Sequence, residues 1–151
     1  MPAYHQNTYQ LIFTPKHRHP VLEKAGRPRL FAYATGFFKN KKCVLFAVNG
    51  VEDHLHFVFY KHPSIAESDL IRDLKKALHS FIDKTGIFPM FTNWQVRYSC
   101  FSYSYKDRNR VIAYVEKQEV HHAHQLNDYL TELRQLYAEN GLQLNEDQYL
   151  E

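Results

Sequence analysis

The alternation of apolar and polar residues predicts strands and helices along the first part of the chain. Residues 4–14 are rich in aromatic and β-branched side chains, which is typical of a strand. Over residues 27–41, apolar residues recur at helical spacing and predict an amphipathic helix. Two apolar runs, residues 43–48 and 54–60, flank a turn-like segment, so we expect them to form a hairpin.

A longer amphipathic helix is expected after this hairpin. Ser64 or Ser68 is placed to cap it, and its apolar stripe continues up to Gly86. Residues 96–105 then alternate between apolar and polar side chains, which predicts another strand.

The last part of the chain contains two predicted helices. Asp107 is placed to cap a helix over residues 108–122. A further, C-terminal helix over residues 127–139 is followed by a tail that reaches residue 151. The resulting order is β-α-β-β-α-β followed by two helices. This is the ferredoxin-like split β-α-β pattern, an α+β fold in which helices pack on an antiparallel sheet. Because no linker or repeat interrupts the pattern, we expect residues 1–151 to form a single domain.

Composition limits the class of protein. Hydrophobic residues make up 44% and charged residues 23% of the 151 positions, so the chain can bury a core without disulfides. Cys43 and Cys100 lie in apolar runs and form no CxxC pair, which is typical of a reduced intracellular protein. The apolar runs are far shorter than the ~18–20 residues that span a bilayer, and the N-terminus lacks a secretory pattern. We therefore expect a cytoplasmic protein with no membrane partner.

Charge is unevenly distributed. Residues 1–50 carry eight Lys or Arg and one acid, whereas the whole chain has a net charge of only +3. This asymmetry favours binding of a polyanion to one face of the protein, although solvated lysines alone would also produce the asymmetry. The candidate nucleic-acid contacts are the basic residues of three clusters: Lys16 and Arg18; Lys41 and Lys42; Arg72, Lys75 and Lys76.

The sharpest local motif is His54-Leu55-His56. In a strand the two histidines share a face, roughly 6–7 Å apart along the chain, while Leu55, Phe57 and Phe59 occupy the opposite, buried face. Two neutral imidazoles side by side can ligate one divalent metal ion. An exposed pair of strand histidines is the alternative. Two acids precede the motif and either orient an imidazole or solvate the turn: Glu52 and Asp53.

A tyrosine and a glutamine lie one helical turn apart in the predicted helix over residues 108–122. Tyr114 and Gln118 share a face, so the glutamine oxygen is a candidate third ligand and the phenol a candidate nucleophile beside it. Such a donor set suits Mg²⁺ or Mn²⁺ better than a closed zinc site. The alternative is that Tyr114 packs against apolar neighbours and Gln118 is a surface residue. Three nearby histidines are either rival ligands or solvated residues at a helix end: His121, His122 and His124.

Taken together in this order, the motifs resemble the single-tyrosine HUH transposases, small enzymes of insertion sequences that move as single-stranded DNA, and their relatives associated with repetitive palindromes. Five segments carry the resemblance: LIFTPKHR-x-PVL at residues 11–22, GVEDHLHFVF around the two histidines, FSYS at 101–104, VIAYVEKQEVHH at 111–122, and NEDQYL at 145–150. Three departures stand out: Gln10 where His is common, Lys117 where Asn is frequent, and WQVRYS without the usual glycine.

The resemblance implies a function and roles for particular residues. Tyr114 would attack a phosphodiester of single-stranded DNA and form a 5′-phosphotyrosine link, while His54, His56 and Gln118 hold Mg²⁺ or Mn²⁺. It also implies recognition of DNA hairpins near the ends of the element, and a homodimer whose active sites are completed in trans. A domesticated hairpin-binding protein without transposition activity is the alternative. A replication initiator or relaxase is disfavoured, because those enzymes usually carry further domains.

Overall fold

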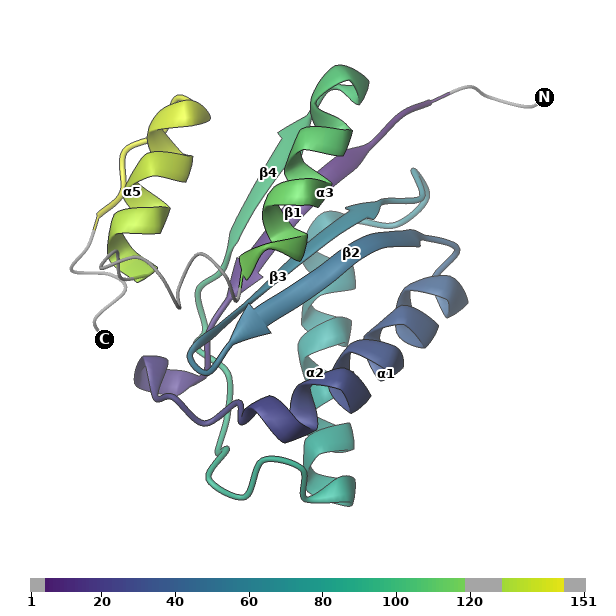
Figure 1. The fold of residues 1–151 in the computed structure, drawn as a ribbon. Coiled ribbons are helices and arrows are strands. Elements are labelled where there is room, and N and C mark those ends of the chain that lie inside the picture. The colour runs from purple at the N-terminus through teal and green to yellow at the C-terminus, as the bar shows by residue number, and fades with distance from the viewer. Residues whose placement is uncertain (1–4, 119–128, 146–151) are drawn as a thin grey trace.

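The computed structural model describes residues 5–118 and 129–145. Within them, four strands form one sheet in the order β2-β3-β1-β4 (Figure 1). All neighbouring strands are antiparallel, and their bounds are β1 Thr8–Phe13, β2 Val44–Val51, β3 His54–Tyr60 and β4 Ser99–Tyr103. An antiparallel sheet with helices packed on it confirms the predicted α+β fold.

The helices cover the sheet in two layers. One face carries α1 (Arg27–Asn40) and α2 (Glu67–Thr85), and the other carries α3 (Arg108–Glu116) and α5 (Tyr129–Glu139) (Figure 1). Three short 3₁₀ turns precede helices or follow strands: Lys16–Arg18, Lys24–Gly26 and Tyr105–Asp107.

The layer under α1 and α2 contains the main apolar core. Phe13, Phe57 and Phe59 project from β1 and β3 toward these helices and meet Phe38 and Leu74, all of them 0–1% exposed. Aromatic rings stack across the strands, with the Phe13 and Phe57 centroids 5.4 Å apart. This continuous core fixes the register of β3 and therefore the face on which its remaining side chains lie.

The layer under α3 and α5 contains two smaller apolar clusters. Ile12 and Phe101 pack against α5, and Val58 packs against Val111 and Val115 of α3. Between these clusters the sheet buries polar side chains instead: Thr8, Gln10, His54, His56 and Ser99. Strand β3, which carries both histidines, is thus buried on both faces, whereas the sequence had left exposure of the histidines open as an alternative.

A close approach of backbone occurs in the β2–β3 hairpin. Gly50 pairs with Leu55, and a Cβ at position 50 would lie 2.5 Å from the carbonyl oxygen of His54. Only glycine allows the two strands to approach this closely directly beside the histidine pair.

Several predicted boundaries require correction. The α2 helix is preceded by Ala66 in extended conformation, and within the described residues it has no side-chain cap, so neither Ser64 nor Ser68 caps it. The tyrosine helix, predicted over residues 108–122, ends at Glu116 because Lys117 leaves helical geometry. Asp107 does precede that helix, but its carboxylate accepts a hydrogen bond from the Ser104 hydroxyl.

Some predictions fall outside the described residues. These are the beginning of the first predicted strand, the end of the tyrosine helix with His121, His122 and His124, the first residues of the C-terminal helix, and the tail from residue 146 onward. In the part of the chain that the structure describes, no helix combines the length and apolarity needed to cross a membrane. The cytoplasmic location remains a prediction.

Candidate metal and nucleophile site

His54 and His56 lie side by side on the polar part of the sheet. Their ring centroids are 5.2 Å apart, and both side chains are fully buried. The two-residue period of β3 turns both imidazoles toward α3 and α5, while Leu55 and Phe57 are held in the main core. The strand therefore presents two ring nitrogens to one buried space.

His54 is held by a carboxylate on one side and faces an amide on the other. Its Nδ1 lies 2.7 Å from Oδ1 of Asp53, and its Nε2 lies 3.3 Å from Oε1 of Gln118 and 3.5 Å from Oε1 of Glu132. Burial acts to lower the pKa of His54, but hydrogen bonds and charge from Asp53 and Glu132 outweigh it and raise this pKa to about 9. Glu52, the other acid near the motif, pairs instead with Arg27 at 3.6 Å.

His56 is oriented by a side-chain amide. Its Nδ1 lies 2.8 Å from Oε1 of Gln10, and the Gln10 Nε2 donates to the Tyr103 hydroxyl at 2.9 Å. Because the amide nitrogen is committed to Tyr103, the amide oxygen accepts from the Nδ1–H of the imidazole, which directs Nε2 toward the site. Gln10, a departure from the family pattern, thus orients the imidazole of His56.

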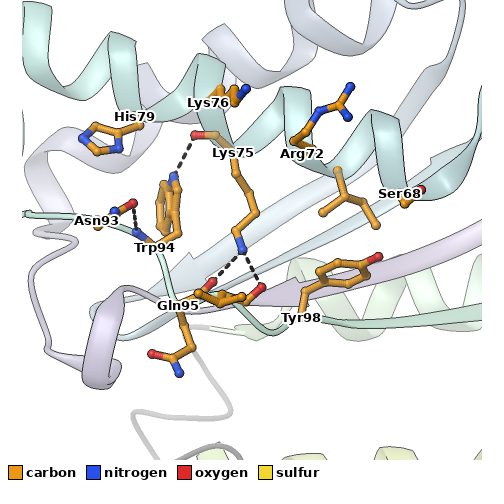
Figure 2. A pocket seen from close by; sticks show the side chains of 11 residues that line it. Ser68, Arg72, Lys75, Lys76, His79, Asn93, Trp94, Gln95 and Tyr98 are labelled. Carbon is orange, nitrogen blue, oxygen red and sulfur yellow. Dashed lines mark hydrogen bonds between the residues drawn. The ribbon is translucent and has the colours of Figure 1, made fainter. Parts of the chain in front are cut away.

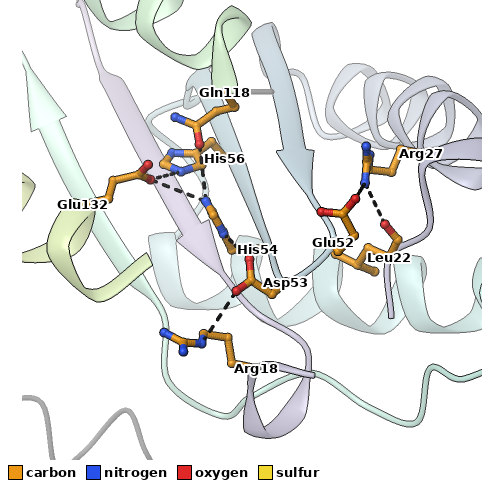
Figure 3. A network of polar contacts seen from close by, with 9 residues as sticks. All are labelled: Arg18, Leu22, Arg27, Glu52, Asp53, His54, His56, Gln118 and Glu132. Atoms are coloured by element: carbon orange, nitrogen blue, oxygen red, sulfur yellow. Dashed lines mark hydrogen bonds and ion pairs between the residues drawn. The ribbon is translucent and has the colours of Figure 1, made fainter. Parts of the chain in front are cut away.

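Glu132 is a site residue that the sequence analysis missed. Its Oε1 lies 2.7 Å from Nε2 of His56, and it is only 8% exposed (Figure 3). The potential ligand atoms of His54, His56 and Glu132 all lie within 4.8 Å of one another. The signal was present in the pattern of the last helix, where Glu132 shares the apolar stripe of Tyr129, Leu133 and Leu136. An acid on such a stripe indicates a buried partner.

Gln118 follows the turn that ends α3 and is fully buried. Its Oε1 points toward the histidine pair, whereas its Nε2 has no hydrogen-bond partner among the described residues (Figure 3). The amide therefore presents its acceptor to the site at the cost of an unpaired donor, which is the orientation a metal ligand would require.

Tyr114 joins the site from α3. Its ring centroid lies 6.0 Å from that of His56. Burial raises the pKa of Tyr114 well above its usual value, the charge of Glu132 adds to the shift, and the nearby amide of Gln118 acts in the opposite direction. The phenol is therefore protonated at neutral pH and is next to the amide and the carboxylate of the site.

These side chains fit a divalent metal ion. Two imidazole nitrogens, one carboxylate oxygen and one amide oxygen converge, the imidazoles are held in a defined orientation by Asp53 and Gln10, and the amide nitrogen has no partner within residues 5–118 and 129–145. Mixed nitrogen and oxygen donors of this kind suit Mn²⁺ and related ions, and held imidazoles are typical of metal sites.

The predicted nucleic-acid contacts do not form one cluster. Arg72, Lys75 and Lys76 of α2 line a cavity of about 350 Å³, to which Trp94 and Val96 also contribute (Figure 2). The Lys75 ammonium donates to the carbonyl oxygens of Gln95 at 2.5 Å and Val96 at 3.2 Å, and burial lowers its pKa to about 8. This cavity is lined by residues of α2, which packs on the face of the sheet opposite to α3 and α5 (Figure 1).

The remaining predicted contacts differ in their surroundings. Lys41 pairs with Asp73 at 3.2 Å, and Arg72 pairs with the same carboxylate at 3.3 Å, so part of this basic charge is neutralised. Lys16 is exposed, and Lys42 adopts a positive φ just after α1. Arg18 lies beside the histidine site, 3.7 Å from Asp53.

The fold and this site together define a class of α+β protein in which a strand with two histidines meets a helix with one tyrosine. Residues 3–118 match the family model described as IS200-like transposase. The chain therefore belongs to the family of IS200-like transposases, which confirms the resemblance seen in the sequence.

Two solved structures share the fold. One, from Deinococcus radiodurans and assigned as a transposase, is 21% identical, covers 78% of this chain and 95% of its own, and has a TM-score of 0.61. The other, a REP-associated tyrosine transposase bound to a REP hairpin, is 17% identical, covers 81% of this chain and 74% of its own, and has a TM-score of 0.59. Among curated protein sequences, none matches this chain significantly.

Proposed function

We propose that this chain cleaves and rejoins single-stranded DNA, with Tyr114 as the nucleophile and a divalent metal ion, Mg²⁺ or Mn²⁺, at His54, His56, Gln118 and Glu132. The observation that carries the proposal is the placement of the Tyr114 ring beside His56, with Gln118 and Glu132 at its hydroxyl. Membership of a transposase family makes DNA the substrate that this arrangement fits best.

The proposed reaction is a transesterification. The Tyr114 oxygen attacks the scissile phosphorus, the P–O3′ bond breaks, and the strand ends as a 5′-phosphotyrosine and a free 3′-OH. The phenol loses one proton and the leaving O3′ gains one. Because phenolate is a far better leaving group than an alkoxide, a 3′-OH of another strand can reverse the step, and no nucleotide cofactor is consumed.

The protein side chains prepare this step before the substrate arrives. Asp53 and Gln10 hold the two imidazoles in fixed orientations, and burial of the pair excludes water from their ring nitrogens. When bound, the metal ion supplies the positive charge that polarises the phosphate and offsets the carboxylate of Glu132. Gln118 holds its oxygen toward the same space.

The proposed substrate is a strand with a hairpin near the end of the element. One structural neighbour is bound to a REP hairpin, and the cavity lined by Arg72, Lys75 and Lys76 offers basic groups to a DNA backbone. In the single chain, Tyr114 lies beside His56 of the same chain. A homodimer in which the tyrosine helix completes the site of the partner subunit remains a prediction.

A cleavage assay tests this function. Hairpin-bearing single strands are incubated with the protein and Mn²⁺, and denaturing gels report nicking and covalent attachment. We expect Tyr114→Phe to abolish the adduct while hairpin binding stays within about twofold of wild type. The matched control is Tyr105→Phe, because Tyr105 is 65% exposed and contacts Arg108 outside the site; it should remain active. Binding without nicking in the wild type would favour the domesticated hairpin-binding protein.

A further inference from the structure

The turn after β1 has an unusual backbone. His17 and Arg18 follow each other with φ values of 58° and 54°, in the left-handed region that residues other than glycine rarely adopt. Neither residue is a glycine, so this sequence keeps two side chains in a conformation that disfavours them. Non-glycine residues in such conformations gather at functional sites.

Hydrogen bonds hold this turn against the segment before β4. The Lys16 amide donates to the carbonyl oxygen of Asn93 at 2.9 Å, and the His17 amide donates to Oε1 of Gln95 at 3.1 Å. The Arg18 amide closes the turn on the carbonyl oxygen of Pro15 at 2.9 Å. Three successive amides are thus paired, which fixes the backbone from which the Arg18 side chain extends.

The Arg18 side chain extends to the histidine site. Its Nε lies 3.7 Å from Oδ2 of Asp53, whose other oxygen contacts Nδ1 of His54 at 2.7 Å. Its guanidinium also lies 5.8 Å from the centre of the Tyr129 ring, and that ring lies 4.5 Å from the His54 ring. Figure 3 shows Asp53 between Arg18 and His54. On one side Asp53, and on the other Tyr129, therefore lies between the guanidinium and His54, a proposed metal ligand.

Within the described residues, one donor of this guanidinium has no acceptor. The Arg18 side chain as a whole is 32% exposed, but its Nη1 atom is buried and has no hydrogen-bond partner there. Its neighbouring carboxylate is shared with His54, and the ion pair at 3.7 Å is longer than a charge-assisted hydrogen bond. A buried, permanently charged donor requires an acceptor, and a doubly accepting anion matches the planar geometry of a guanidinium best.

We propose that Arg18 binds a phosphate oxygen of the single-stranded DNA at the active site, at the scissile phosphate or the phosphate next to it. This inference rests on the proposed function for the identity of the substrate. It distinguishes Arg18 from the basic residues of α2, which lie on the other side of the sheet and would contact the strand elsewhere. The strained turn exists to place this guanidinium beside the histidine pair.

The test compares charged and neutral phosphates in protein that cannot cleave. Tyr114→Phe and the double variant Tyr114→Phe/Arg18→Ala are titrated with hairpin-bearing strands that carry one methylphosphonate, moved one phosphate at a time along the unpaired segment. At one position we expect the neutral phosphate to weaken binding of Tyr114→Phe by about tenfold and to leave the double variant unaffected. Equal penalties for both proteins at every position would overturn the proposal.

The outcome is separable from that of the proposed function, because the titration requires no covalent chemistry. If Tyr114 is not the nucleophile, the titration still finds one phosphate whose methylphosphonate penalty depends on Arg18. If wild-type cleavage is found, its position must lie within one nucleotide of that phosphate. An Arg18-dependent phosphate farther away would contradict placement at the active site.

A control separates substrate binding from a structural role. Arg29→Ala removes the same charge from the exposed surface of α1 and should leave the methylphosphonate penalty of Tyr114→Phe intact. Arg18→Ala should also leave the affinity for Mn²⁺ without DNA within about twofold of wild type, whereas a role through Asp53 alone would lower that affinity together with cleavage. If Arg18→Ala fails to fold, Arg18→Lys is used. This variant keeps the positive charge but loses the parallel N–H donors of the guanidinium, and it should retain part of the methylphosphonate penalty.

Discussion

The two faces of the sheet use the same strands for different purposes. Toward α1 and α2, alternate residues of β1 and β3 build one continuous apolar core around Phe13 and Phe57. Toward α3 and α5, the intervening residues bury polar groups between two small apolar clusters. His56 and Phe57 are adjacent in sequence, equally buried, and belong to opposite faces.

The difference indicates that stability and chemistry are divided between the faces. Buried apolar side chains stabilise the fold in proportion to the area they remove from water. Buried imidazoles and carboxylates gain little net stability, because desolvation offsets much of their mutual attraction. The polar face is therefore retained for what it binds, and the apolar face keeps it in register.

The largest expected effect is on the apolar face. Phe57→Ala should lower the free energy of unfolding by about 3–5 kcal/mol, because it leaves a cavity beside Phe13 and Phe38. Urea denaturation measures it. The matched change on the other face is His56→Leu/Glu132→Leu, which replaces a buried polar pair by apolar groups of similar size and should change stability by no more than about 1 kcal/mol. A double variant as unstable as Phe57→Ala would remove the distinction between the faces.

The next effect is on metal binding. Glu132→Gln should weaken Mn²⁺ binding by about 10–100-fold, because it removes the negative charge from a donor set that otherwise consists of neutral groups. Calorimetric titration without DNA measures it. Glu139→Gln is the control, since Glu139 lies exposed on the same helix. Equal affinity of Glu132→Gln and wild type would exclude Glu132 as a ligand.

A smaller effect is the pH dependence of the metal-free protein. Because the folded protein raises the pKa of His54 from 6.5 to about 9, it binds this proton more tightly than the unfolded chain does. The resulting stability is complete below about pH 6.5 and is lost as the pH rises through about 9, and its size is of the order of 1–3 kcal/mol. Unfolding in EDTA between pH 6 and pH 9.5 measures it.

The variant His54→Gln isolates this contribution. It should unfold with a weaker pH dependence over the same range, because the titrating imidazole is absent. If wild type and His54→Gln show identical pH profiles, the contacts of His54 with Asp53 and Glu132 do not hold a proton in the metal-free protein.

The smallest expected effect concerns backbone strain at two positions of positive φ, one near each face of the sheet. His17→Gly should raise the free energy of unfolding by at most about 1 kcal/mol, because glycine adopts a positive φ without steric cost. Gly86→Ala should lower it by about 1 kcal/mol, since Gly86 ends α2 with a φ of 66°. Thermal unfolding of both variants measures the two changes in the free energy of unfolding. Destabilisation by His17→Gly would show that the turn at the histidine site is not strained.

The order of elements and the shared face of His54 and His56 could be predicted, because periods of 2.0 and 3.6 residues are local properties of the sequence. The spacing also predicted that Tyr114 and Gln118 come together, although α3 ends between them and the two do not share a regular helical face. Glu132 could not be placed, because its role depends on how α5 packs across the sheet, some 76 residues from His56. The role of Gln10 was missed as well, since the orientation of an imidazole is set by neighbours on another strand.

Helix boundaries were predicted less well for a related reason. Ser64 and Ser68 are good capping residues, yet α2 begins after Ala66, where packing of Leu70 and Ile71 on the core outweighs the preference for a cap. The tyrosine helix ends before Gln118, which moves the glutamine off the regular helical face. Such deviations arise from tertiary contacts that a periodic pattern does not contain.

We propose above all that the polar face of the sheet carries out a strand-cleavage reaction through Tyr114. The most direct measurement is mass spectrometry of the protein digested after reaction with hairpin-bearing single-stranded DNA and Mn²⁺. We expect one nucleotide adduct, linked through phosphate to Tyr114. An adduct on any other residue, or cleavage of the strand with no adduct on the protein, would contradict it.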